Sequence, residues 1–193
     1  MLDRRTYLVK ERVAMLRLID TYDILDPETG ATIGIAQERI SGGLKALRLL
    51  INKRLLPTTV VISEREGGPA ILTIKRGVSF LHAAVHVLDA RGSTIGSFKS
   101  KLFSLGGAFR VFNSAGAEVA LVKGDWKGWN FQFLENGGRR LGTVTKKWAG
   151  IGKELFTSAD NYVIALEAEG MPPVVASLLL AAGIAIDTVY KEK

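Results

Sequence analysis

The sequence of 193 residues contains no cysteine, and this excludes a disulfide framework, a cysteine-based zinc site and palmitoylation. It has only five prolines against 21 glycines, a balance that favours many tight turns. Residues 1–7 form no apolar segment of the kind that a secretory signal needs. We therefore expect a cytoplasmic chain, because the absence of cysteine fits a reducing compartment.

The sequence also lacks the common motifs of catalysis. It contains neither a Gly-x-Ser-x-Gly nucleophile motif nor a phosphate-binding loop. His82 and His86 are the only histidines, and Asp89 is the only carboxylate near them. These residues make a poor zinc site, because zinc needs three or four protein ligands. We expect no enzymatic activity and no cofactor.

What the chain has in excess is positive charge. Lys and Arg number 26 against 19 Asp and Glu, which gives a net charge of +7. Such an excess favours anionic partners such as nucleic acid, anionic lipid or a phosphorylated small ligand. The basic residues form no long run, so the same charge also fits a role in solubility. Nucleic acid is the weakest of these options, because basic and aromatic residues do not interleave along a strand.

One pattern recurs through the middle of the chain: an alternating apolar segment, an Asp, Asn or Glu, a glycine and a second short segment. It covers residues 22–34, 85–96, 109–119 and 131–142, with a weaker copy at 60–72. This pattern is typical of β-hairpins, since the acidic or amide side chain bonds to the turn backbone and glycine supplies the positive φ. Successive hairpins with one apolar face each indicate a sandwich or a closed barrel.

The alternation within these segments assigns their side chains to two faces. We expect these apolar residues to point inward: Tyr22, Ile24, Val85, Val87, Phe109, Val111, Phe131 and Phe133. Their polar neighbours should point outward: Asp23, His86, Arg110 and Gln132.

The C-terminal stretch 172–190 is predicted to be a helix that starts at two prolines and is apolar on all sides. Its length would be roughly 28 Å. Such a helix must be buried in protein or in lipid. The apolar run ends at Asp187, short of the usual span of about 20 residues. Lys191 and Lys193 would also have to cross the bilayer. A helix buried inside a barrel is therefore favoured over a membrane span.

Residues 43–55 predict a second, amphipathic helix that ends before Pro57. Its apolar residues Leu44, Leu47, Ile51 and Leu55 recur at helical spacing. The basic residues of this segment are Lys45, Arg48, Lys53 and Arg54. The helix either caps one end of the barrel with a solvated basic face or lies on a membrane surface.

The last third of the chain resembles a known family. Residues 147–162, KWAGIGKELFTSADNY, are similar to the signature region of phospholipid scramblases, and the apolar tail ending at Asp187 resembles that family's C-terminus. The segment YDILDPETG at 22–30 also resembles its N-terminal core. Scramblases are grouped with the LURP-one-related and Tubby proteins. The resemblance implies a mainly β fold in which about twelve antiparallel strands close around the buried helix 172–190. The length of the chain favours one domain over 1–193, which would include the short helix 43–55.

The resemblance also implies a calcium-binding acidic segment, but this chain keeps only some of its acidic residues. Asp160 and Asn161 keep their places, but Ser158 stands where the family has an aspartate. Calcium prefers six to eight oxygen ligands with several carboxylates, so we expect weak calcium binding or none. Asp160 and Asn161 also suit a simple turn. The proline-rich arm and the cysteine cluster of animal scramblases are absent as well.

Three functions follow from these features. The first is a lipid- or phosphoinositide-type binding module at an anionic membrane surface, a role that Tubby-like relatives suggest. The second is a soluble barrel that binds a small ligand or a protein. The third is a scramblase whose C-terminal helix enters the bilayer. The candidate lipid-binding residues are the four basic residues of 43–55 together with Lys123, Lys127, Arg139, Arg140, Lys146 and Lys147.

Overall fold

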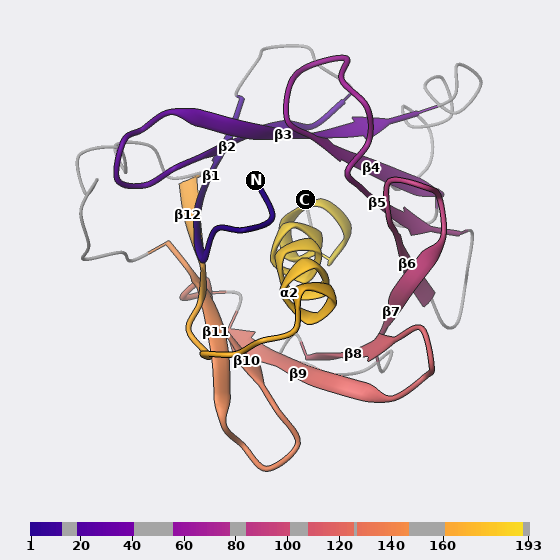
Figure 1. Ribbon diagram of the computed structural model, residues 1–193, viewed down its shortest axis with the longest axis vertical. Helices are drawn as coiled ribbons and strands as arrows, with labels where there is room; N and C mark the ends of the chain where they lie inside the picture. The colour runs from indigo at the N-terminus through magenta and orange to yellow at the C-terminus, as the bar shows by residue number, and fades with distance from the viewer. Residues whose placement is uncertain are drawn as a thin grey trace.

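The computed structural model describes residues 1–12, 19–40, 56–77, 84–100, 108–125, 127–146 and 161–190. Twelve antiparallel strands form a closed barrel in which each strand pairs with its neighbours in sequence and β12 pairs with β1 (Figure 1). The strands are β1 (Thr6–Glu11), β2 (Thr21–Leu25), β3 (Thr32–Arg39), β4 (Thr58–Ser63), β5 (Leu72–Arg76), β6 (Ala84–Leu88), β7 (Thr94–Ser100), β8 (Phe109–Asn113), β9 (Glu118–Asp125), β10 (Asn130–Leu134), β11 (Arg140–Thr145) and β12 (Asn161–Leu166). The predicted mainly β barrel is confirmed.

The predicted hairpins are present. The turns of β6–β7, β8–β9 and β10–β11 share one geometry, in which a glycine amide donates to the carbonyl three residues earlier. In the β6–β7 turn, the amide of Gly92 donates a hydrogen bond to the carbonyl of Asp89 (3.0 Å), and the Asp89 carboxylate accepts from Ser93 N (2.9 Å). Gly92 has φ 81°, a left-handed conformation that glycine adopts without strain. The connections β2–β3, β4–β5, β6–β7, β8–β9 and β10–β11 all lie at one end of the barrel, called the tight-turn end here.

The predicted faces are also confirmed. The eight residues predicted to point inward are all at most 3% exposed. Of those predicted to point outward, His86, Arg110 and Gln132 are exposed and Asp23 is half-buried. The predicted alternation therefore holds at these positions, where one face of the strand lies in the core and the other lies toward solvent.

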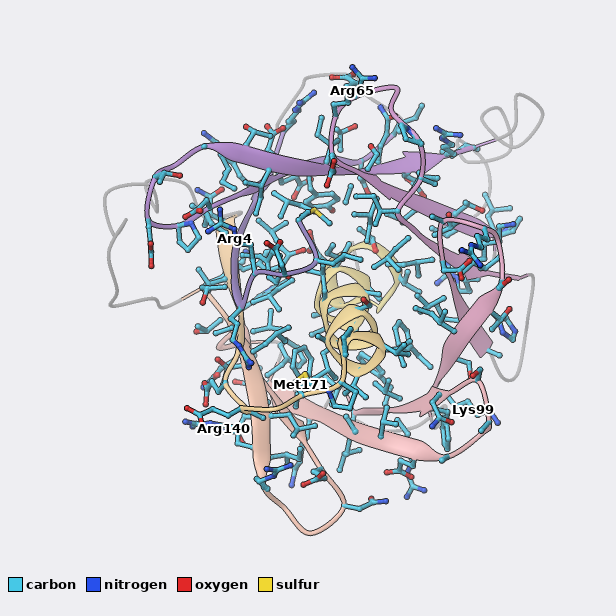
Figure 2. The ribbon with its side chains drawn as sticks, viewed as in Figure 1. Arg4, Arg65, Lys99, Arg140 and Met171 are labelled. Carbon is cyan, nitrogen blue, oxygen red and sulfur yellow. The ribbon has the colours of Figure 1, made fainter. Side chains whose placement is uncertain are left out.

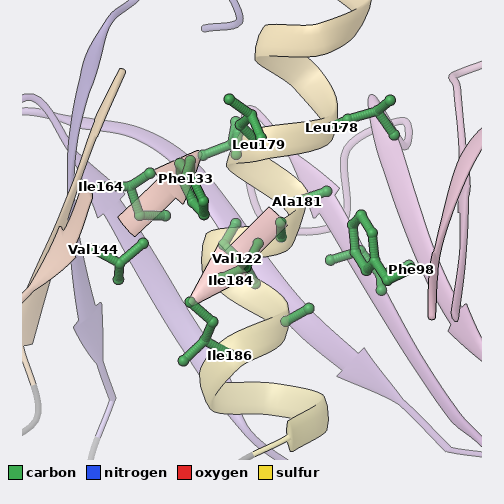
Figure 3. Close-up of a cluster of buried hydrophobic side chains, with 14 of the residues drawn as sticks. Phe98, Val122, Phe133, Val144, Ile164, Leu178, Leu179, Ala181, Ile184 and Ile186 are labelled. Atoms are coloured by element: carbon green, nitrogen blue, oxygen red, sulfur yellow. The ribbon is translucent and has the colours of Figure 1, made fainter. Parts of the chain in front are cut away.

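The core is built around the C-terminal helix, which lies in the lumen of the barrel (Figures 1 and 3). Helix α2 (Pro173–Ala185) begins at two prolines, as predicted, and continues as a π-helical segment, η3 (Ile186–Tyr190). Leu178, Leu179 and Ile184 are fully buried, and Figure 3 shows Leu178 on the side of Phe98 and Leu179 on the side of Phe133. The helix starts at the tight-turn end, and η3 reaches the opposite end, called the η3 end here.

Within the part of the chain that the structure describes, no helix is long and apolar enough to cross a membrane.

Strand β12 is buried on both faces along its whole length. Tyr162 and Ile164 belong to the core around the helix, while Val163 and Ala165 form a second cluster with Leu8 on the other face of the sheet. An unbroken apolar run is typical of a strand that is covered on both sides.

The predicted helix 43–55 and His82 lie outside the described residues. The assignment of residues 1–193 to a single domain stays a prediction.

Candidate anion-binding surface

The predicted lipid-binding residues are only partly placed by the structure. Lys45, Arg48, Lys53, Arg54 and Lys147 lie outside the described residues. Lys123, on β9, and Lys127, in the β9–β10 turn, are exposed. The remaining three lie along β11: Arg139 precedes the strand, Arg140 begins it and Lys146 follows it.

Five described candidates do not converge into one phosphate site. Lys127 and Lys146 lie at the η3 end, next to the start of β10 and the end of β11. Arg139 and Arg140 lie at the tight-turn end, where β10 leads into β11. Lys123 lies between these groups, directly opposite Gln132 on β10. A single phosphate group therefore cannot contact both ends of β10, because a strand of five residues spans about 17 Å.

The two arginines at the tight-turn end already have carboxylate partners. Arg139 Nε donates to Glu135 Oε2 at 2.8 Å, and Arg140 Nε donates to Glu167 Oε2 at 2.7 Å. Figure 2 shows Arg140 on the outer side of the wall. These ion pairs reduce the local excess of positive charge at this end.

Lys146 packs on an aromatic side chain. Its Nζ lies 4.7 Å from the centroid of the Trp129 ring, within the range of a cation–π contact. Trp129 is 8% exposed, has φ 48° and lies 5.1 Å from the ring of Tyr162. Trp129 therefore packs on aromatic residues of neighbouring strands, Phe131 of β10 and Tyr162 of β12.

The candidate calcium residues are only partly described. Asn161 is 2% exposed and begins β12, opposite Lys10 of β1, and Asp160 lies outside the description. Among the residues that the structure describes, no group of three or more His, Cys, Asp or Glu side chains is arranged to hold a metal ion. The expectation that Asp160 and Asn161 bind calcium weakly or not at all stays a prediction.

The structure gathers a set of basic residues of which the sequence analysis selected only Lys123 as a lipid-binding candidate. Strands β5 to β9 carry outward-facing side chains that we call the basic wall: Lys75, His86, Lys99, Arg110 and Lys123. Cross-strand register brings them together, since Lys75 is directly opposite His86 and Lys99 is directly opposite Arg110. The sequence alternation could have predicted that each of these residues points outward. It could not have predicted that they lie close together, because that depends on how separate strands pair.

Few carboxylates neutralise the basic wall. Lys75 and Lys123 have no ion pair within the described part of the chain. Lys99 places its Nζ 4.9 Å from the centroid of the Phe112 ring, and Arg110 Nη1 is 3.4 Å from Glu118 Oε2. By contrast, at the tight-turn end Arg4 pairs with Asp26 at 3.1 Å, as Arg139 and Arg140 pair with glutamates. Within the described residues, the basic wall therefore carries more cations than carboxylate partners.

Polar groups also occupy the lumen at the η3 end. The buried Arg76 donates from Nη1 to the carbonyl of Val189 at 2.8 Å and from Nη2 to the carbonyl of Leu56 at 3.1 Å. Burial raises the pKa of the Tyr22 and Tyr162 hydroxyls, and the nearby Asp187 carboxylate raises each pKa further. This end of the lumen holds the last turn of the chain in place and keeps both phenols neutral.

A comparison with known families gives one match. A family model described as Scramblase matches residues 20–193, from the start of β2 through the central helix. No curated protein matches the chain, and no solved structure matches it.

Proposed function

Because the chain belongs to the scramblase family, we propose that it is a non-enzymatic module that binds anionic phospholipid headgroups at the cytoplasmic surface of a membrane. Membership of this family fits a lipid-related role. The observation that carries the proposal is the basic wall, where Lys75, Lys99 and Lys123 have no carboxylate partner in the described part of the chain. Exposed cations of this kind are attracted to anionic lipid, each by about 1 kcal/mol near the surface.

The placement of the C-terminal helix supports a peripheral mode of binding over insertion. Leu178, Leu180 and Ile184 are fully buried inside the barrel, where they contact strands rather than solvent. Transfer of this helix to a bilayer would leave the lumen without its filling, and each exposed apolar core side chain would cost roughly 1.5–3 kcal/mol. Attraction between the outer surface and lipid headgroups requires no such rearrangement.

Flotation of the purified protein with liposomes tests the proposal. We expect flotation with vesicles that contain phosphatidylserine, release at high salt and no flotation with pure phosphatidylcholine, because salt screens charges at a surface. Protein that remains unbound under every condition would contradict the proposal and favour a soluble barrel that binds a small ligand or a protein. Protein that binds neutral vesicles and resists salt would favour insertion.

A further inference from the structure

One row of the basic wall crosses four neighbouring strands on the outer face. Lys99 on β7 is directly opposite Arg110 on β8, and Arg110 is directly opposite Leu121 on β9. Leu121 in turn is directly opposite Leu134 on β10. Directly opposed residues of antiparallel strands point to the same face, so two cations and two leucines form one continuous row.

The cations of this row lie where they repel one another. Like charges directly opposite in a sheet are destabilising, and the Lys99–Arg110 pair is of this kind. Lys75 and His86 form a second pair of basic residues at directly opposite positions. Glu118 offsets part of this charge through Arg110 at 3.4 Å. An anion that binds between the strands would relieve the remaining repulsion.

Apolar side chains accompany these cations. Leu121, Leu134 and Phe112 are outward-facing and only half-buried. The ring of Phe112 lies beneath the ammonium group of Lys99, with 4.9 Å between the ring centroid and Nζ. Side chains that combine an apolar body with a cationic tip suit the boundary between lipid headgroups and acyl chains.

We propose that the barrel docks side-on, with the outer face of β7–β10 against the membrane, Lys99, Arg110 and Lys123 on lipid phosphates, and Leu121 and Leu134 at the level of the headgroups. This inference rests on the proposed function and specifies which surface performs it. Neither end of the barrel meets the bilayer in this arrangement, and the central helix stays in the lumen.

A pair of triple variants with equal change in net charge tests the docking surface. The wall variant combines Lys99→Gln, Arg110→Gln and Lys123→Gln, the three cations of the proposed contact. The control variant combines Arg65→Gln, Arg91→Gln and Arg139→Gln, three exposed arginines in separate turns of the tight-turn end. We expect the wall variant to bind phosphatidylserine vesicles roughly a hundredfold more weakly than wild type. The affinity of the control variant for the same vesicles should fall much less. Thermal unfolding of both variants checks that the barrel remains folded.

The outcomes separate this inference from the proposed function. If wild-type protein floats and both triple variants lose affinity equally, the effect is one of net charge alone. That result overturns side-on docking but leaves the proposed function standing. A wall variant that binds like wild type also overturns it. Wild-type protein that fails to float contradicts the proposed function itself. In that case, saturable shifts of wall amide resonances with inorganic phosphate would identify a soluble phosphate as the ligand instead of a lipid.

Because the chain has no cysteine, a single introduced cysteine gives a second, independent test. Gln132→Cys places an environment-sensitive fluorophore opposite Lys123, whereas Thr29→Cys places it in the β2–β3 turn, away from the wall. We expect vesicles with phosphatidylserine to shift the emission of the label at position 132 to the blue and to leave the label at position 29 unchanged. An equal shift at both positions, or a shift at position 29 alone, overturns side-on docking.

Discussion

Leu178 of the central helix packs directly on the backbone of Gly96 in β7, so closely that a Cβ atom at Gly96 would lie 2.7 Å from Leu178 Cδ2. The carbonyl of Phe112 approaches the same position from the neighbouring strand. This contact fixes the distance between helix and wall at the tight-turn end, and glycine is the residue that permits it.

The first prediction concerns this approach. Gly96→Ala should lower the free energy of unfolding by about 1–3 kcal/mol, because the added methyl group overpacks the space between helix and strand. Gly77→Ala is the matched control, since a Cβ at Gly77 would meet nothing within 4 Å among the described residues and Gly77 has no positive φ. Urea denaturation of both variants measures the difference. Equal stability of the two variants would contradict close packing of the helix on β7.

The second prediction compares two buried tyrosines. Tyr7 Oη donates a hydrogen bond to the carbonyl of Arg4 at 2.6 Å, whereas Tyr22 Oη has no hydrogen-bond partner within the described part of the chain. Tyr7→Phe should therefore cost about 1 kcal/mol of stability, and Tyr22→Phe should cost nothing or stabilise the fold. Thermal or chemical unfolding tests both variants, and a larger loss for Tyr22→Phe than for Tyr7→Phe would refute this assignment.

The third prediction is a loss of stability in alkali. Burial raises the pKa of Tyr7 from 10.0 to about 12, and burial also raises the pKa of Tyr22 and Tyr162. The folded protein therefore keeps these protons when the unfolded chain has lost them, and stability falls as the pH rises from about 10 toward 12. Melting temperatures measured across this interval should fall more steeply for wild type than for Tyr7→Phe. If the melting temperatures of the two proteins fall in parallel, the pKa of Tyr7 is the same in the folded and the unfolded state, which would contradict the prediction.

The fourth prediction concerns the end of the chain. Arg76 bonds the carbonyl of Val189, and it also contacts Thr58 Oγ1 at 3.1 Å. Arg76→Gln should destabilise the protein by roughly 3 kcal/mol or more, because these buried carbonyl groups lose a charged donor. Hydrogen exchange at residues 186–190 should accelerate more than exchange in the first turns of α2. Uniform acceleration along the whole helix would contradict a local role for Arg76 in holding η3.

Much of the fold was predictable because the hairpins carry local signals. In the repeat that includes Val85, Val87 and Gly92, alternation sets the faces and the turn residues set the connections. Strand β12 was harder to predict, since Val163 is buried on the face away from the helix and its run shows no alternation. The burial of Arg76 was also harder to predict. An arginine is stable in the lumen because it donates hydrogen bonds to carbonyl groups there, and the sequence does not show these partners.

The candidate surface could not be predicted to the same extent. Sequence analysis favoured adjacent basic pairs such as Arg139 and Arg140, which the structure places in ion pairs with glutamates. The basic wall depends instead on residues about ten apart, such as Lys99 and Arg110, which become neighbours only through strand pairing. Register between strands is set by the closed barrel as a whole.

The binding of wild-type protein to vesicles of increasing phosphatidylserine content, measured at low and at high salt, tests the central claim most directly. The account predicts that affinity rises with the fraction of anionic lipid and falls as salt is added. Equal affinity for neutral and anionic vesicles, or affinity that salt leaves unchanged, would contradict binding through exposed cations on the outer wall of the barrel.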